Sequence, residues 1–140
     1  MAGKFMAWDG TIPPMVQQED RPFREKWFFF YGPMTGPAVL KQLLNRSQMS
    51  ALPHAMIFGH KILHWGDLPV AIQMGAENAV GGVVCKIVSQ DELDWLEGYM
   101  TRIFQVDGCM AWLDNHSQVS GFVFVWDGEM SLLSESPQIF

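Results

Sequence analysis

The chain is poor in the features that mark several large classes of protein. Its 140 residues include only two cysteines, and its nine lysines and arginines are outnumbered by fifteen acidic residues. No apolar run approaches the roughly 20 residues that a membrane-spanning helix needs. The first ten residues contain no continuous apolar segment, so we expect neither a signal peptide nor a membrane anchor. These shortages favour a cytoplasmic protein.

The net charge and the cysteines limit the classes of partner that we expect for this chain. A net charge of −6 argues against nucleic acid as a partner, because phosphate binding needs a basic surface. Cys85 and Cys109 both lie in apolar, strand-like stretches, so we expect free thiols in a reducing compartment. A small molecule is therefore the expected partner.

Hydrophobic residues make up 49% of the chain, which is enough to build the core of one domain. We expect an N-terminal extension over 1–26, a domain over 27–127 and a tail over 128–140. Strand signals outnumber helix signals and alternate poorly with them, which favours an α+β fold built on a small mixed barrel. The expected strands are Phe28–Tyr31, Ala55–Leu63, Val70–Met74, Val80–Ser89, Arg102–Val106, Met110–Leu113 and Phe122–Trp126, with a hairpin turn at Asp107-Gly108.

The aromatic segment 27–31 is typical of a buried strand, and it ends at the turn Gly32-Pro33. Pro37 then fits the first position of a helix, since its φ is already helical and its missing N–H would have had no partner there. A strand, a tight glycine turn and a helix bring backbone close to a ligand in many sites, although ordinary turns share the pattern.

A second helix is predicted by the capping box at Ser89–Glu92, and Gly98 is a natural stop. Glu97 lies at the C-terminal end of this helix, where the dipole disfavours a carboxylate. It also lies four residues after Leu93, on or beside the buried face. Partial burial there would raise the pKa of Glu97 and suit it to proton transfer; the alternative is a solvated glutamate at a frayed helix end.

Taken together, these segments resemble the γ-glutamylcyclotransferase-like family, also called AIG2-like. Its pattern is a strand ending in Tyr-Gly-Ser/Thr-Leu, a helix, a strand pair, a Tyr-Pro-Ala-like segment and Leu-Asp-x-x-Glu-Gly. The resemblance covers roughly residues 27–127 and rests on order and spacing. The matching segments are Phe29-Phe30-Tyr31-Gly32, Pro37-Ala38-Val39-Leu40, Gly59-His60-Lys61, Leu68-Pro69-Val70-Ala71, Val80-Gly81-Gly82-Val83-Val84 and Leu93-Asp94-Trp95-Leu96-Glu97-Gly98.

The resemblance implies a mixed barrel with a cavity at one mouth and a monomer or homodimer. It makes Glu97 the general acid/base of an intramolecular cyclisation that releases 5-oxoproline from a γ-glutamyl amine. The substrate supplies its own nucleophile, so no metal or organic cofactor is expected. The implied substrate-binding residues are Tyr31, Gly32, Pro33, Met34, Leu68, Tyr99 and Thr101.

This chain departs from the family pattern at the substrate-binding turn. Pro33 stands where the family has serine or threonine, and it removes both a hydroxyl and a backbone N–H donor. Thr101 stands where the family often has tyrosine, with Tyr99 nearby as a substitute. We expect a more apolar pocket, with Met34, Met74, Met100 and Trp95 as candidates for its lining; plain core packing is the commoner role of such residues.

Three functions follow from these observations. The first is a γ-glutamylcyclotransferase-like enzyme that uses Glu97. The second is a repurposed member that cyclises, isomerises or eliminates an apolar small molecule in a biosynthetic pathway. The third is a non-enzymatic binding module, in which Glu97 would be open to water. His60 and His64 share a strand face, but no further ligand lies at metal-binding spacing, so zinc is not expected.

Overall fold

The structure is a computed structural model that describes residues 23–100 and 103–137. Within these residues, no helix is long and apolar enough to cross a membrane. The elements, in chain order, are β2 (Lys26–Phe30), the 3-10 helix η1 (Gly32–Thr35), α2 (Pro37–Leu43), β3 (His54–Phe58), β4 (His60–Trp65), β5 (Leu68–Gln73), β6 (Ala79–Ile87), α3 (Gln90–Met100), β7 (Phe104–Leu113), β8 (Gln118–Trp126) and the 3-10 helix η2 (Met130–Leu132).

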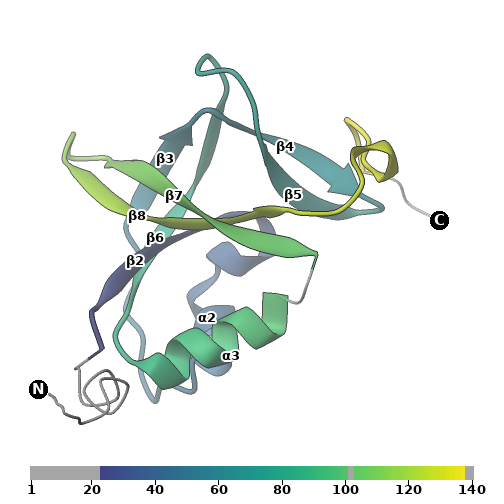
Figure 1. The fold of residues 1–140 in the computed structure, drawn as a ribbon. Coiled ribbons are helices and arrows are strands. Elements are labelled where there is room, and N and C mark those ends of the chain that lie inside the picture. The colour runs from purple at the N-terminus through teal and green to yellow at the C-terminus, as the bar shows by residue number, and fades with distance from the viewer. Residues whose placement is uncertain (1–22, 101–102, 138–140) are drawn as a thin grey trace, which may run out of the picture.

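Five strands close into a barrel in the order β2-β6-β3-β7-β8, and β4 and β5 form a separate two-stranded sheet (Figure 1). The β2–β8 pair is parallel, whereas the other four barrel pairs are antiparallel. The predicted α+β fold with a small mixed barrel is confirmed.

The aromatic segment forms β2, which has barrel strands on both sides and is buried on both faces. Phe29 points into the barrel interior, while Phe28 and Phe30 pack outside it toward the helices. A strand covered on both faces needs a continuous apolar run rather than an alternating one. This double burial explains why the strand carries three consecutive phenylalanines, Phe28 to Phe30.

Small side chains fill the barrel interior, because a five-stranded barrel leaves little room inside. Phe29 is the one aromatic residue in this buried cluster. The lack of space also explains Gly82, because a Cβ at this position would collide with the carbonyl oxygen of Phe30. The other fully buried members are Ala55, Ile57, Ala71, Val80, Val84, Ala111, Val123 and Val125.

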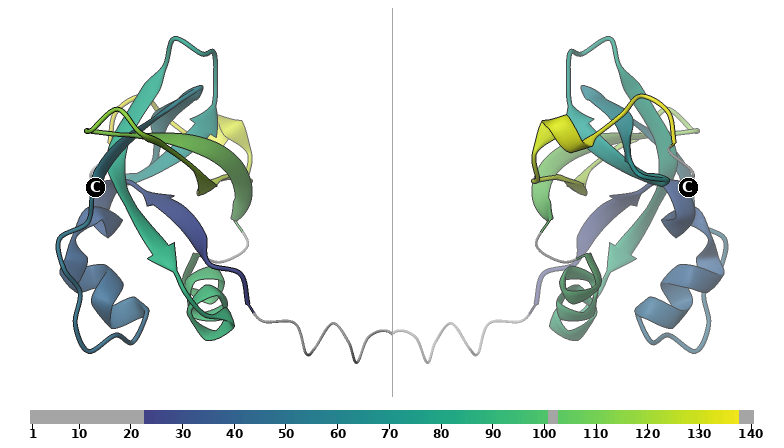
Figure 2. Two further views of the ribbon diagram at one scale, coloured as in Figure 1. Left: turned by 90° about the vertical axis from the view of Figure 1, so that its left-hand side faces the viewer. Right: turned by 90° about the vertical axis from the view of Figure 1, so that its right-hand side faces the viewer.

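Both helices pack at one end of the barrel, as the two side views show (Figure 2). A second buried cluster lies between them and the strands, with Leu40 and Leu44 from the α2 segment and Leu96 from α3 all fully buried. The prediction of a helix starting at Pro37 is confirmed, with Gly36 at its N-cap. The capping interaction at α3 is also present: the Glu92 amide donates to Ser89 Oγ at 3.1 Å.

Three local predictions are wrong. Asp107 and Gly108 lie within the ten-residue strand β7, and the actual β7–β8 turn falls at 114–117, where His116 has a φ of 69°. The expected strand 55–63 is divided into β3 and β4 at Gly59, which has a φ of 82°. The second helix does not stop at Gly98 but continues to Met100.

The segment after β8 packs back onto the molecule. Ser134 and His64 exchange two backbone hydrogen bonds, with N···O distances of 2.8 and 2.9 Å. Leu133 packs against the cluster formed by β4, β5 and Trp126. The predicted N-terminal extension lies outside the described residues up to residue 22, and the division of the chain at 26 and 127 stays a prediction.

A charged pair that the sequence did not predict ties α3 to the rest of the fold. Glu92 is only 6% exposed, and its carboxylate accepts from Arg46 Nε at 2.6 Å and from Arg46 Nη2 at 2.7 Å. The same Nη2 also donates to the Lys86 carbonyl at 2.7 Å, and the Val88 amide donates to Glu92 at 3.0 Å. The pair therefore joins the segment after α2, the end of β6 and the first turn of α3. Hydrogen bonds from Arg46 lower the pKa of Glu92 below its ordinary value.

We predict that Glu92→Gln lowers the unfolding free energy by about 1.5–3 kcal/mol at pH 7, because a charge-assisted pair is lost. Since folding lowers the pKa of Glu92, its stabilisation is complete above the unfolded value of 4.5 and is lost as the pH falls through the lower folded value. Urea unfolding of both proteins at pH 7 and at acidic pH should therefore show a difference that shrinks in acid.

The matched control is Glu135→Gln, because Glu135 is an exposed partner of Lys61 with its side chain 73% accessible. This change should alter the unfolding free energy by less than about 0.5 kcal/mol. Equal effects of the two substitutions would contradict the structural role given to Glu92.

Candidate active site

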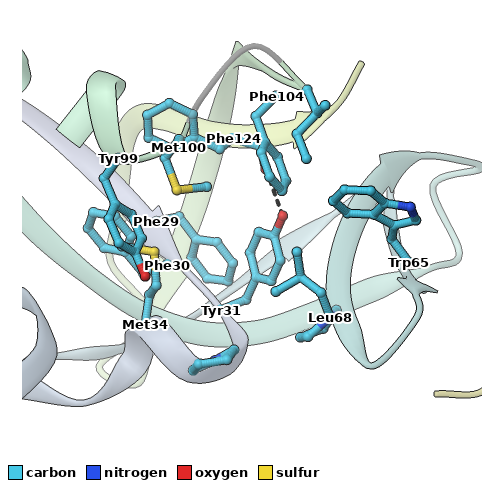
Figure 3. A pocket seen from close by; sticks show the side chains of 13 residues that line it. Phe29, Phe30, Tyr31, Met34, Trp65, Leu68, Tyr99, Met100, Phe104 and Phe124 are labelled. Atoms are coloured by element: carbon cyan, nitrogen blue, oxygen red, sulfur yellow. Dashed lines mark hydrogen bonds between the residues drawn. The ribbon is translucent and has the colours of Figure 1, made fainter. Parts of the chain in front are cut away.

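A cavity of about 460 Å³ opens beside the turn that follows β2 (Figure 3). Five parts of the chain build its walls: the β2–η1 segment, the last turn of α3, the β4–β5 hairpin, the start of β7 and the middle of β8. A cavity of this size suits a small organic ligand. Its lining residues are Phe29, Phe30, Tyr31, Pro33, Met34, Trp65, Leu68, Pro69, Tyr99, Met100, Ile103, Phe104 and Phe124.

Tyr31 lies at the centre of the cavity, and its hydroxyl makes two hydrogen bonds to the protein. It donates to the Phe124 carbonyl in β8 at 2.9 Å and accepts from the Ala71 amide in β5 at 2.9 Å. Burial raises the pKa of Tyr31 to about 12, so the hydroxyl stays neutral at physiological pH. Tyr31 is therefore a fixed wall of the cavity that links the barrel to the hairpin.

The turn after Tyr31 requires the glycine that the sequence places there. Gly32 has a φ of 64°, and a Cβ added to it would lie 2.7 Å from Pro69 Cγ. Pro33 follows in the first turn of η1 and lines the cavity. Thr35 Oγ1 donates to the Gly32 carbonyl at 3.0 Å. The turn thus keeps its compact shape while Pro33 offers no N–H to a ligand.

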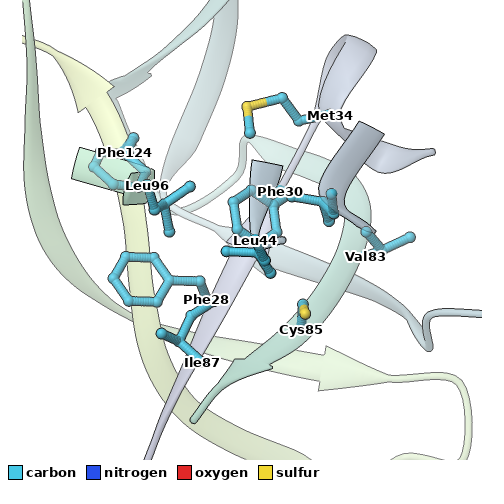
Figure 4. Close-up of a cluster of buried hydrophobic side chains, with 10 residues drawn as sticks. Phe28, Phe30, Met34, Leu44, Val83, Cys85, Ile87, Leu96 and Phe124 are labelled. Atoms are coloured by element: carbon cyan, nitrogen blue, oxygen red, sulfur yellow. The ribbon is translucent and has the colours of Figure 1, made fainter. Parts of the chain in front are cut away.

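The floor of the cavity is continuous with the buried cluster beneath the helices (Figure 4). Phe30, Met34 and Phe124 belong to both, and Leu96 from α3 packs in the same cluster. Because these floor residues are locked in the core, this wall is preorganised rather than formed on binding.

Solved structures with a similar fold were compared with the chain. Two are Arabidopsis thaliana proteins: At3g28950.1, with 22% identity and a TM-score of 0.63, and At5g39720.1, with 19% identity and a TM-score of 0.64. A third is named as a γ-glutamyl cyclotransferase, with 13% identity and a TM-score of 0.60. The chain has the γ-glutamylcyclotransferase-like fold.

The three structures match similar shares of this chain. The matches cover 75%, 80% and 74% of this chain, and 64%, 76% and 67% of the respective partner chains. The chain therefore spans less than two thirds of the length of At3g28950.1. The sequence matches no protein-family profile, and no curated protein matches it.

Glu97, the residue that the resemblance makes the general acid/base of this fold, lies outside the cavity lining. Its side chain is exposed, so the partial burial expected from its distance to Leu93 is wrong. It lies in the last turn of α3, three residues before Met100, which lines the cavity. Residues three apart are neighbours on a helix surface, so Glu97 is next to the α3 wall.

The other predicted site residues divide into three groups. Gly32 shapes the turn without lining the cavity, and Thr101 lies outside the described residues. Of the apolar candidates, Met100 lines the cavity, whereas Met74 and Trp95 are exposed and do not. The residues that do line it are Tyr31, Pro33, Met34, Leu68 and Tyr99.

Several residues of the cavity wall were not predicted from the sequence. Trp65 and Pro69 come from the β4–β5 hairpin, and Ile103 and Phe104 from the start of β7. None shares a local motif with the turn at Gly32, so their position depends on how the hairpin and the barrel pack together. Away from the cavity, Cys85 and Cys109 are free thiols, as expected. Among residues 23–100 and 103–137, no group of three metal-ligating side chains comes together.

We predict that Tyr31→Phe lowers the unfolding free energy by about 1–3 kcal/mol, because the Ala71 amide and the Phe124 carbonyl both lose a buried partner. The matched control is Tyr99→Phe. The side chain of Tyr99 is 58% exposed, so this change should cost less than about 0.5 kcal/mol. Chemical denaturation measures both, and a Tyr31→Phe variant as stable as the wild type would refute the linking role.

Proposed function

We propose that the chain is a cofactor-free enzyme of the γ-glutamylcyclotransferase-like type, in which Glu97 is the general acid/base. The observation that carries this proposal is the position of Glu97, one helical turn before the cavity residue Met100, in a protein with this fold. A carboxylate on the rim of a small-molecule cavity can exchange protons with a ligand whose polar end reaches the mouth.

The reaction is an intramolecular cyclisation. The Glu97 carboxylate takes a proton from the substrate's α-amino group, and the amine nitrogen attacks the γ-carbonyl carbon. A new carbon–nitrogen bond closes the five-membered ring, while the bond to the leaving amine breaks and that amine receives the proton. The products are 5-oxoproline and a free amine. Because both reacting groups belong to one molecule, the protein needs chiefly to fold the substrate and to move the proton.

The exposure of Glu97 favours a second candidate function, a non-enzymatic binding module. In such a protein the cavity would bind its ligand, and Glu97 would be an ordinary surface carboxylate. The two candidates agree on the cavity and differ only in whether bonds are made and broken there.

We predict that Glu97→Gln leaves the protein folded and lowers turnover of a γ-glutamyl amine by about 10²–10⁴-fold, the usual contribution of a general acid/base. The assay is 5-oxoproline release across a series of γ-glutamyl amines. The matched control is Asp94→Asn, because Asp94 is an exposed carboxylate on the same helix that accepts from Gln90 at 2.9 Å. It should leave turnover unchanged.

Wild-type turnover by the Glu97→Gln variant would contradict the catalytic role. No turnover by the wild-type protein, combined with ligand binding that neither substitution alters, would establish the binding module instead.

Pro33 offers a second test of the same turn. Pro33→Ser restores an N–H and a hydroxyl at the cavity and should tighten the binding of a γ-glutamyl amine by roughly 2–10-fold, the contribution of one hydrogen bond. Pro33→Ala is the control, since it restores only the N–H. If calorimetric titration shows no gain with either variant, the role given to this turn in carboxylate recognition is wrong.

A further inference from the structure

Aromatic rings dominate the cavity, and they are arranged from a buried floor to an open mouth. Phe29, Phe30 and Phe124 form the floor and are at most 4% exposed. Trp65 and Tyr99 stand at the mouth and are 41% and 58% exposed. Tryptophan and tyrosine combine an apolar body with a polar tip, so they suit a boundary between an apolar interior and water. The floor therefore suits an apolar group and the mouth suits a polar one.

The described lining offers almost nothing to a charged group. Every lining residue in the part of the chain that the structure describes is uncharged. Among these residues, only Tyr31, Trp65 and Tyr99 have a side-chain N–H or O–H group. Of these, Tyr31 is deepest, and its hydroxyl already donates to Phe124 and accepts from Ala71. A charged ligand group placed on the floor would lose its hydration without gaining a partner, which is strongly unfavourable.

The walls are also suited to a flat ring. The Met34 and Met100 side chains flank the Tyr31 ring on the side of η1 and α3, and Leu68 and Trp65 stand on the hairpin side (Figure 3). Methionine sulfur and aromatic faces pack favourably against rings, and methionine adapts its shape to the ligand. The cavity thus presents soft or flat apolar surfaces on opposite sides.

We propose that this cavity binds an uncharged, ring-bearing apolar group, with the polar end of the same molecule at the mouth beside Tyr99. This inference rests on the proposed function only for the reacting end, where Glu97 would act on the polar group outside the floor. The buried ring, and not a charged α-amino acid head, would then be the part of the substrate that the cavity selects.

Three probes that share one ring and differ in charge test the proposal: 2-(2-naphthyl)ethanol, 2-naphthylacetate and 2-(2-naphthyl)ethylammonium. Isothermal titration of the full chain should show the neutral alcohol binding at least about tenfold more tightly than either ion, because the short arm of each probe keeps its charge beside uncharged walls that offer it no partner. An equal or greater affinity for the acetate or the ammonium would overturn the proposal, as would no detectable binding of the alcohol.

Substitutions locate the binding. Leu68→Arg puts a cation into the wall and should weaken binding of the alcohol by about tenfold or more while favouring the acetate. Leu132→Arg is the control, because Leu132 is 55% exposed on η2 and does not line the cavity. Loss of alcohol affinity in the control alone would place the probe elsewhere and refute the assignment. Thermal unfolding checks that both variants fold. If one of them does not fold, the titration of the wild-type protein with the three probes decides the proposal.

Glu97→Gln separates this inference from the proposed function. The ring-binding floor does not involve Glu97, so the variant should still bind the alcohol more tightly than the acetate or the ammonium. Retained binding without any turnover by the wild type would reject the enzyme and keep the ligand class. Turnover of γ-glutamyl amines together with preferred binding of the charged probes would keep the enzyme and reject the ligand class.

Discussion

The hydroxyl of Tyr31 connects the β4–β5 hairpin to the barrel, in which β2 and β8 already pair through their backbones. It follows β2 in the chain, donates to the carbonyl of Phe124 in β8 and accepts from the amide of Ala71 in β5. Because β4 and β5 form a separate sheet, this hydroxyl fixes the hairpin against the barrel by a directional contact. The hairpin supplies one wall of the cavity, so the shape of the cavity depends on this contact.

The same interaction decides the chemistry of the cavity. A tyrosine hydroxyl offers one donor and two acceptor sites, and here the protein uses the donor and one acceptor. The single O–H donor at the centre of the site is thereby unavailable to a ligand, and burial raises the pKa of Tyr31 to about 12. Pro33 removes a further donor from the neighbouring turn. Structural rigidity and low polarity therefore have a common origin in the Tyr31–Pro33 segment.

Local sequence patterns predicted the parts of the fold that local forces determine. The aromatic run became β2, Pro37 began α2, and Ser89 capped α3 through the Glu92 amide. Asp107-Gly108 failed as a turn because pairing with β8 along the whole of β7 outweighs the turn preference of two residues. Gly98 failed as a helix stop, since a glycine permits an end without requiring one.

The site was predictable where the residues of one turn build it, and not where distant segments meet. Tyr31, Pro33 and Met34 could be found from the strand-turn-helix pattern, and Tyr99 and Leu68 from the resemblance. Phe104 reaches the cavity because β7 closes the barrel, and Trp65 because the separate hairpin packs against it. The burial of Glu97 could not be predicted, because a residue at the edge of the apolar face of a helix can be either buried or exposed. The Arg46–Glu92 pair could not be predicted either, because its two residues are 46 positions apart in the sequence.

Methionine methyl groups can show whether the apolar cavity at Tyr31 is the ligand site of this protein. With methyl-labelled protein and 2-(2-naphthyl)ethanol, nuclear Overhauser contacts from the ring protons should reach Met34 and Met100, which line the cavity. They should be absent for Met56, Met110 and Met130, which are exposed elsewhere. Contacts to those three methionines without contacts to Met34 and Met100 would contradict the proposed ligand site.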